Sequence, residues 1–111
     1  MQAFLLHVPR NPNDWAAWTF NHRVSHDLIR AALAKKGVVL TDYEIDPMPP
    51  NDPRGWLQNH QQLHLDFNAA LNQQSNDLLD VDLSDERQLI GWIQLNHQEH
   101  LDAEAALDVS S

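Results

Sequence analysis

Three stretches of the chain follow one pattern: Trp18-Thr-Phe-Asn-His22-Arg-Val-Ser-His26, Trp56-Leu-Gln-Asn-His60-Gln-Gln-Leu-His64 and Trp92-Ile-Gln-Leu-Asn96-His97-Gln-Glu-His100. The tryptophans that open these stretches are 38 and 36 residues apart, and the same offsets separate Leu33, Leu71 and Leu107 beyond their far ends. A shared pattern at nearly constant spacing indicates an internal repeat. We therefore predict one domain, residues 1–111, built from three repeats at about 1–37, 38–76 and 77–111.

Each repeat predicts a helix of about twenty residues, because its apolar residues recur at the spacing of one helical face. The positions shared by the three helices form the predicted repeat core: Trp18, Trp56, Trp92, His22, His60, Asn96, Leu33, Leu71 and Leu107. The same faces also include Trp15 and Ile29 in the first repeat, Leu63, Phe67 and Ala70 in the second, and Leu89, Ala103 and Ala106 in the third. The predicted fold is mainly α, a compact bundle of three repeated Trp/His helices.

Helix-start and helix-stop signals support these three segments. Asn13-Asp14, Asp52-Pro53 and Ser84-Asp85-Glu86 are typical of helix starts, where capping side chains, proline and acidic residues are favoured. Lys35-Lys36-Gly37 and the polar residues 72–76 predict the ends of the first two helices, and the third is expected to continue to about residue 109. The connectors contain short apolar or alternating runs at residues 3–8, 38–45 and 78–83, which predict short extended or β segments.

Charge and composition narrow the classes of partner. The chain carries a formal net charge of −9 with histidine neutral. An acidic surface repels phosphate, so we expect neither nucleic acid nor an anionic membrane as a partner. The chain has no cysteine, which excludes a disulfide framework, a thiolate nucleophile and a cysteine-ligated zinc site among its residues.

The histidine pairs are the first candidates for chemistry. His22/His26 and His60/His64 lie four residues apart, so each pair places two imidazoles on one helical face, a spacing that suits metal capture. The alternative metal set is His22, His26, His60, His64 and His100. The preferred prediction is that these rings are structural and hold neither metal nor cofactor, packing between helices with their N–H groups bonded to connector carbonyls. A pH-sensing role is a third alternative.

No arrangement typical of an enzyme is evident, and we expect none. Ser25 precedes His26 and Asp27, but adjacent residues on a helix point to different faces and cannot form a triad. The acidic pairs Asp80/Asp82 and Asp85/Glu86 are typical of a solvated surface or a helix start. Only three glycines occur, and none forms a phosphate-binding loop.

The first helix differs from the other two in a second apolar strip. Phe20, Val24 and Leu28 lie opposite its Trp/His face, where the matching positions of the other helices carry glutamine or aspartate. One interpretation is that this helix is central and covered on both sides. The other is that these three residues form an interface for a partner or a second copy.

The pattern also resembles a known class of proteins. Phe4-Leu-Leu-His-Val-Pro9, Asp14-Trp-Ala-Ala-Trp-Thr-Phe-Asn-His22 and the second and third Trp-containing stretches are similar to small virion-associated structural proteins of tailed bacteriophages, from the neck, portal or tail region. The resemblance covers nearly the whole chain and brings no catalytic residue with it. It implies a minor structural or adaptor protein of the virion, assembled in the host cytoplasm, with other virion proteins and copies of itself as partners.

Overall fold

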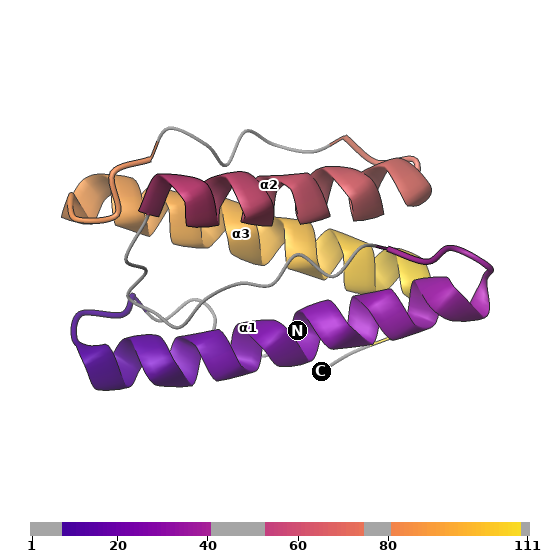
Figure 1. The fold of residues 1–111 in the computed structure, drawn as a ribbon, viewed down its shortest axis with the longest axis horizontal. Helices are drawn as coiled ribbons and strands as arrows, with labels where there is room; N and C mark the ends of the chain where they lie inside the picture. The colour runs from indigo at the N-terminus through magenta and orange to yellow at the C-terminus, as the bar shows by residue number, and fades with distance from the viewer. Residues whose placement is uncertain (1–7, 41–52, 75–80, 110–111) are drawn as a thin grey trace.

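The computed structural model describes residues 8–40, 53–74 and 81–109, and these residues form three α-helices: α1 (Pro12–Lys35), α2 (Pro53–Ala70) and α3 (Glu86–Leu107) (Figure 1). The prediction of a mainly α bundle is confirmed. Within the described residues no β-strand forms, and the described parts of the predicted extended runs, residues 38–40 and 81–83, are turn or irregular chain. Of the first run only Val8 is described, and it too is irregular chain; residues 3–7, 41–45 and 78–80 lie outside the described residues.

Local signals set the helix ends. Asn11 caps α1, its side chain accepting a hydrogen bond from the Asp14 backbone N–H at 2.9 Å, so the helix begins slightly earlier than predicted. Asp85 caps α3 in the same way, through the N–H of Gln88. Helix α3 ends at Leu107 because Asp108 takes the left-handed conformation, with φ 55°, that closes many helices.

All three helices run in the same direction (Figure 1). Parallel neighbours place equivalent positions at one level, and the ring centroids of Trp18, Trp56 and Trp92 are accordingly 5.5–6.5 Å apart. Parallel helices also need connectors that return along the bundle. A connector of about 15 residues reaches roughly 50 Å when extended, which exceeds the length of any of these helices.

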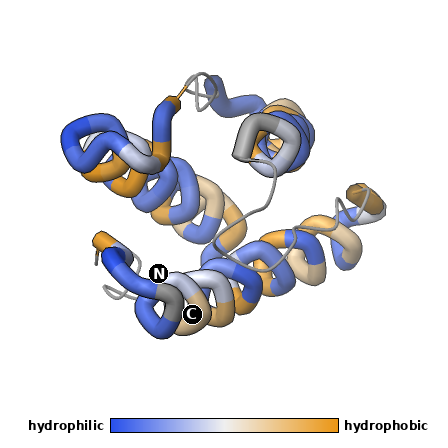
Figure 2. Tube along the Cα trace, turned by 60° about the vertical axis from the view of Figure 1, so that its left-hand side comes forward, coloured by the Kyte–Doolittle hydropathy of each residue, from blue (hydrophilic) through white to orange (hydrophobic). Residues whose placement is uncertain are grey.

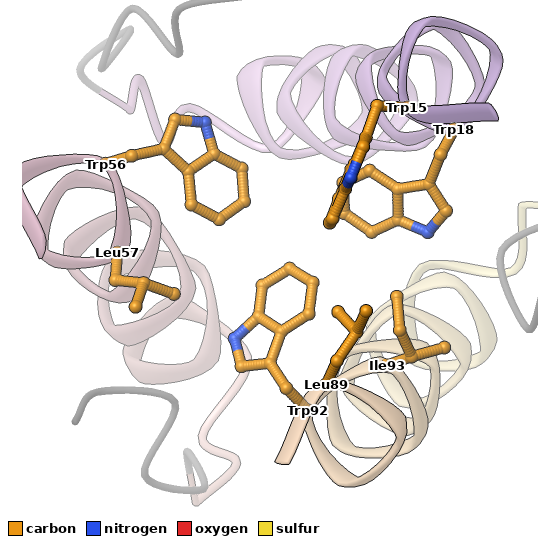
Figure 3. Packing of buried hydrophobic residues seen from close by; sticks show 7 residues of the cluster. All are labelled: Trp15, Trp18, Trp56, Leu57, Leu89, Trp92 and Ile93. Atoms are coloured by element: carbon orange, nitrogen blue, oxygen red, sulfur yellow. The ribbon is translucent and has the colours of Figure 1, made fainter. Parts of the chain in front are cut away.

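The core consists of two hydrophobic clusters at different levels of the bundle. The first is formed by Trp15, Trp18, Trp56, Leu57, Leu89, Trp92 and Ile93, whose side chains point inward from the three helices (Figure 3). The second is formed by Ile29, Leu33, Leu63, Phe67, Ala103 and Leu107. Hydrophobic and hydrophilic residues alternate along each helix, as expected when one face is buried (Figure 2).

Most of the predicted helical faces are buried, with three differences. The three repeated tryptophans, which we call the tryptophan layer, are all buried, as the repeat pattern predicts. Ala70 and Ala106, placed on the buried faces by the sequence, are exposed, and Leu71 is only partly buried. Ala70 and Ala106 share one position of the repeat pattern, next to Leu71 and Leu107, and the equivalent Ala32 is only partly buried, so this position lies at the edge of the buried face. None of the described helices is long and apolar enough to span a membrane.

Candidate metal centre

Five buried histidines meet on the axis of the bundle, between the two hydrophobic clusters. They are His22, His26, His60, His64 and His100, and one ring nitrogen from each lies within 4.8 Å of the corresponding nitrogen of every other. No side chain of this histidine cluster is more than 5% exposed. These are the five residues of the alternative metal set, whereas His97, three residues before His100, lies outside the cluster.

Helix geometry explains how each helix contributes to the cluster. Residues four apart project from one face, so α1 supplies His22 and His26 and α2 supplies His60 and His64. Helix α3 supplies His100, and the position equivalent to His22 and His60 carries Asn96, whose side chain is also fully buried.

The ring nitrogens face one another. The Nε2 atom of His22 lies 3.2 Å from His60 Nε2 and 3.1 Å from His100 Nε2. The Nε2 atoms of His26 and His64 are 3.2 Å apart. Within the described residues these nitrogens therefore contact each other and nearby side chains, and none bonds a connector carbonyl.

Hydrogen bonding alone does not satisfy so many close nitrogens. An imidazole nitrogen carries either one proton or one in-plane lone pair, so it makes one hydrogen bond. His22 Nε2 nevertheless has three polar neighbours at 3.1–3.2 Å, namely His60 Nε2, His100 Nε2 and Asn96 Oδ1. At least two of these contacts cannot be hydrogen bonds made by His22.

A buried glutamate orients His64. Its Nδ1 lies 3.1 Å from Glu99 Oε1, and Asn68 donates a hydrogen bond to the same oxygen at 2.8 Å. An ionised carboxylate only accepts hydrogen bonds, so in a neutral ring the proton sits on Nδ1. The Nε2 atom of His64 then presents a lone pair to the centre of the cluster.

A serine and a second glutamate do the same for His100. Ser25 Oγ donates to Glu104 Oε2 at 2.8 Å and lies 2.6 Å from His100 Nδ1. Because the serine hydroxyl proton is directed to Glu104, the Oγ atom accepts from His100 Nδ1–H. This arrangement again leaves the Nε2 lone pair facing inward, and Nδ1 bonds to a carboxylate, directly or through a hydroxyl, are typical of metal-binding histidines.

Burial keeps the five imidazoles neutral. Desolvation lowers the pKa of His22 to about 3, although its hydrogen bond with Asn96 opposes the shift. Desolvation, reinforced by the neighbouring imidazoles, also holds the pKa of the other four rings well below the ordinary value; these are His26, His60, His64 and His100. Neutral imidazole is the form of histidine that binds metal ions.

Aromatic rings close both ends of the cluster. On the side of the tryptophan layer, Trp18 stacks on His22 with centroids 4.5 Å apart, and Trp56 stacks on His60 at 5.1 Å. On the other side, Phe67 packs against His64 at 4.6 Å. Among the cluster histidines and Asn96, two buried polar atoms have no hydrogen-bond partner in the described part of the chain: His60 Nδ1 and Asn96 Nδ2.

Sequence reasoning missed the side chains that surround the histidines. Ser25 and Glu99 each precede a cluster histidine by one residue, and Asn68 and Glu104 each follow one by four. All four are buried. The repeat register was the available signal, because it puts Ser25 and Glu99 at one shared position and Asn68 and Glu104 at another.

The predicted interface residues lie away from the cluster. Phe20 is 68% exposed and Val24 is 36% exposed, while Leu28 is partly buried. The interpretation that α1 is covered on both sides within the monomer therefore does not hold at Phe20.

No protein-family model, curated protein or solved structure matches the chain.

Proposed function

We propose that this protein is a metal-binding helical domain that holds one transition-metal ion in its histidine cluster. The observation that supports this most directly is the convergence of five buried ring nitrogens within 4.8 Å. The sequence analysis gave a histidine-based metal site only as an alternative. The geometry of the cluster favours this alternative.

Distances between the ring nitrogens support a shared ion. Two nitrogens bound to one metal at 2.0–2.1 Å lie about 2.9–3.4 Å apart, the range running from octahedral to tetrahedral angles. The closest Nε2 pairs, including His22 with His60 and His26 with His64, are separated by 3.1–3.2 Å. Such separations suit nitrogens bound to a common cation better than two lone pairs in direct contact.

Charge also favours a cation. Glu99 and Glu104 are both buried and both connect to cluster histidines, directly or through Ser25. Ionised, they carry two negative charges beside five neutral rings, which a divalent ion in the cluster complements. Imidazole ligands suit zinc, copper, iron, cobalt and nickel, and not magnesium or calcium.

The sealed position of the cluster suggests what the ion does. Catalytic metal sites keep a coordination position open to substrate, whereas structural sites are closed. Here aromatic and aliphatic side chains cover the cluster on both sides. We therefore assign the ion a stabilising role in the bundle.

Metal content tests the proposal. Untagged protein is purified under reducing conditions, stripped with a chelator and titrated separately with Zn(II), Ni(II), Co(II) and Fe(II), and bound metal is counted by elemental analysis. One ion per chain is expected, with loss of binding in His64→Ala. The matched control His97→Ala removes a histidine outside the cluster and keeps full binding. A folded chain that binds none of the four ions overturns the proposal.

A second candidate function is protein association through α1. The observation that favours it is the exposed apolar pair Phe20 and Val24 on the outer face of that helix. The tailed-phage resemblance makes virion proteins of the neck, portal or tail the proposed partners, and the threefold repeat the proposed origin of the bundle. A strict monomer at high concentration that co-purifies with no virion component would count against this candidate.

A further inference from the structure

We infer that the metal in this centre is six-coordinate, with Asn96 Oδ1 as its sixth donor, and that the site selects Ni(II), Co(II) or Fe(II) over tetrahedral Zn(II). This inference rests on the proposed function, because it concerns the geometry of the same ion.

The repeat register supplies six donor positions and not five. In three parallel helices, each with two inward positions four residues apart, equivalent residues form two triangles on the bundle axis. One triangle is His22, His60 and Asn96; the other is His26, His64 and His100. Two stacked triangles of donors describe a six-coordinate site.

In the first triangle, Asn96 Oδ1 lies as close to the two histidine nitrogens as two donors bound to one ion lie to each other. This Oδ1 atom is 2.9 Å from His60 Nε2 and 3.2 Å from His22 Nε2, close to the 3.1–3.2 Å between the nearest ring nitrogens. The side chain is fully buried, and its Nδ2 atom has no hydrogen-bond partner in the described residues.

Metal binding changes what Asn96 can contact. Without metal, Oδ1 accepts a hydrogen bond from the Nε2–H group of His22 or His60. Once both Nε2 lone pairs bind an ion, neither nitrogen carries that proton, and the amide oxygen needs another positive partner. The ion held by the two neighbouring rings is that partner. The other orientation of the amide would place Nδ2, which is only a donor, beside ring nitrogens whose lone pairs are already bound to the metal.

The number of imidazoles argues against a four-coordinate ion. A tetrahedral zinc ion uses four nitrogens and leaves a fifth buried ring without its metal bond. An octahedral ion with bonds of about 2.1 Å spans about 4.2 Å between opposite donors. The five ring nitrogens already lie within 4.8 Å of one another, and Asn96 Oδ1 lies 2.9 Å and 3.2 Å from two of them. A contraction of about half an ångström therefore suffices to bring these donors around one ion.

Co(II) is the probe that reads coordination number directly. Six-coordinate Co(II) has weak visible bands, tetrahedral Co(II) has intense ones, and X-ray absorption counts the nitrogen and oxygen neighbours. For the unaltered protein we expect weak bands and six neighbours. One Co(II) per chain with intense bands and four neighbours overturns the six-coordinate assignment and leaves metal binding intact. No Co(II), Ni(II), Fe(II) or Zn(II) binding instead overturns the proposed function.

Two substitutions test the role of Asn96. Asn96→His completes a six-histidine set and should keep the weak bands while binding Ni(II) at least as tightly. Asn96→Ala removes a donor and should weaken Ni(II) binding about tenfold or more, with a smaller change for Zn(II). The control Asn59→Ala alters an exposed asparagine beside His60 and should change neither. Circular dichroism of each apoprotein checks folding. Unchanged Ni(II) binding and Co(II) spectra in folded Asn96→Ala overturn the inference.

Discussion

The tryptophan layer and the histidine cluster are neighbouring sections of one bundle, made by the same three helices from positions four residues apart. Trp18, Trp56 and Trp92 fill their section with apolar rings. The next section along the axis is filled with imidazoles that face one another. The same backbone arrangement thus holds an ordinary core at one level and a polar core at the next.

This difference has an energetic consequence. Buried indoles stabilise the fold chiefly by removing their large apolar rings from water, and each has only one polar group, the N–H; the Nε1 atoms of Trp56 and Trp92 have no hydrogen-bond partner among the described residues. Buried imidazoles lose their hydrogen bonds to water, and this cost is offset only if each ring nitrogen finds a partner. His22 Nε2 has more polar neighbours than it can bond. We therefore expect the tryptophan layer to be stable by itself and the histidine cluster to depend on a bound ion.

Removing an indole from the tryptophan layer should have the largest effect on stability. Trp92→Ala opens a cavity among three tryptophans and should lower the free energy of unfolding by about 3–5 kcal/mol. Urea unfolding followed by circular dichroism measures the loss. Phe20→Ala removes an exposed aromatic ring and should change stability by no more than about 0.5 kcal/mol. A loss below 1 kcal/mol for Trp92→Ala would show that the layer is not a packed core.

Removing the metal should have the next largest effect. A ligand at about 100 times its dissociation constant stabilises the native state by about 2.7 kcal/mol, so stripping the loaded protein should lower its thermal midpoint by several degrees. Melting with and without EDTA at pH 7.5 checks this. His64→Ala, which lacks one ligand, should respond much less to the chelator. Equal midpoints for the loaded and stripped native protein would instead favour purely structural histidines.

Acid should destabilise the apoprotein through the cluster. Burial lowers the pKa of the cluster rings, to about 3 for His22, whereas an unfolded histidine has a pKa of about 6.5. Between these values the unfolded chain binds more protons, so stability falls as pH drops below about 6.5 and is unaffected by these rings above it. Each ring contributes a slope of about 1.4 kcal/mol per pH unit. Urea midpoints at pH 7.5, 6.5 and 5.5 measure this, and equal midpoints would contradict it.

Changing the outer face of α1 should affect stability least. Because Phe20 and Val24 are exposed, Phe20→Asp with Val24→Asp should cost the monomer no more than about 1 kcal/mol in total. If α1 is an interface, the same double change abolishes association. Size-exclusion chromatography with light scattering checks this by giving the molar mass of each oligomeric form. Unfolding of the isolated double variant would instead show that these side chains stabilise the monomer.

The sequence by itself determined the three helices and most of their buried faces. These features are local: residues three and four apart share a helical face, and an N-cap residue such as Asp85 marks where a helix begins. The repeat offsets likewise predicted that Trp18, Trp56 and Trp92 would be buried. The alternative metal set was identified from the spacing of its histidines within each helix.

Only the tertiary structure decided that these histidines meet. A helix fixes the direction of its own side chains, but the parallel arrangement and the relative height of three helices are set by long-range packing. That arrangement brings His22, His60 and Asn96 to one level and turns their ring nitrogens and amide toward a common centre. It also places Glu99 and Glu104 behind the rings. A buried carboxylate is stabilised only by hydrogen bonds, and the groups that bond these two, His64 and Ser25, come from other helices.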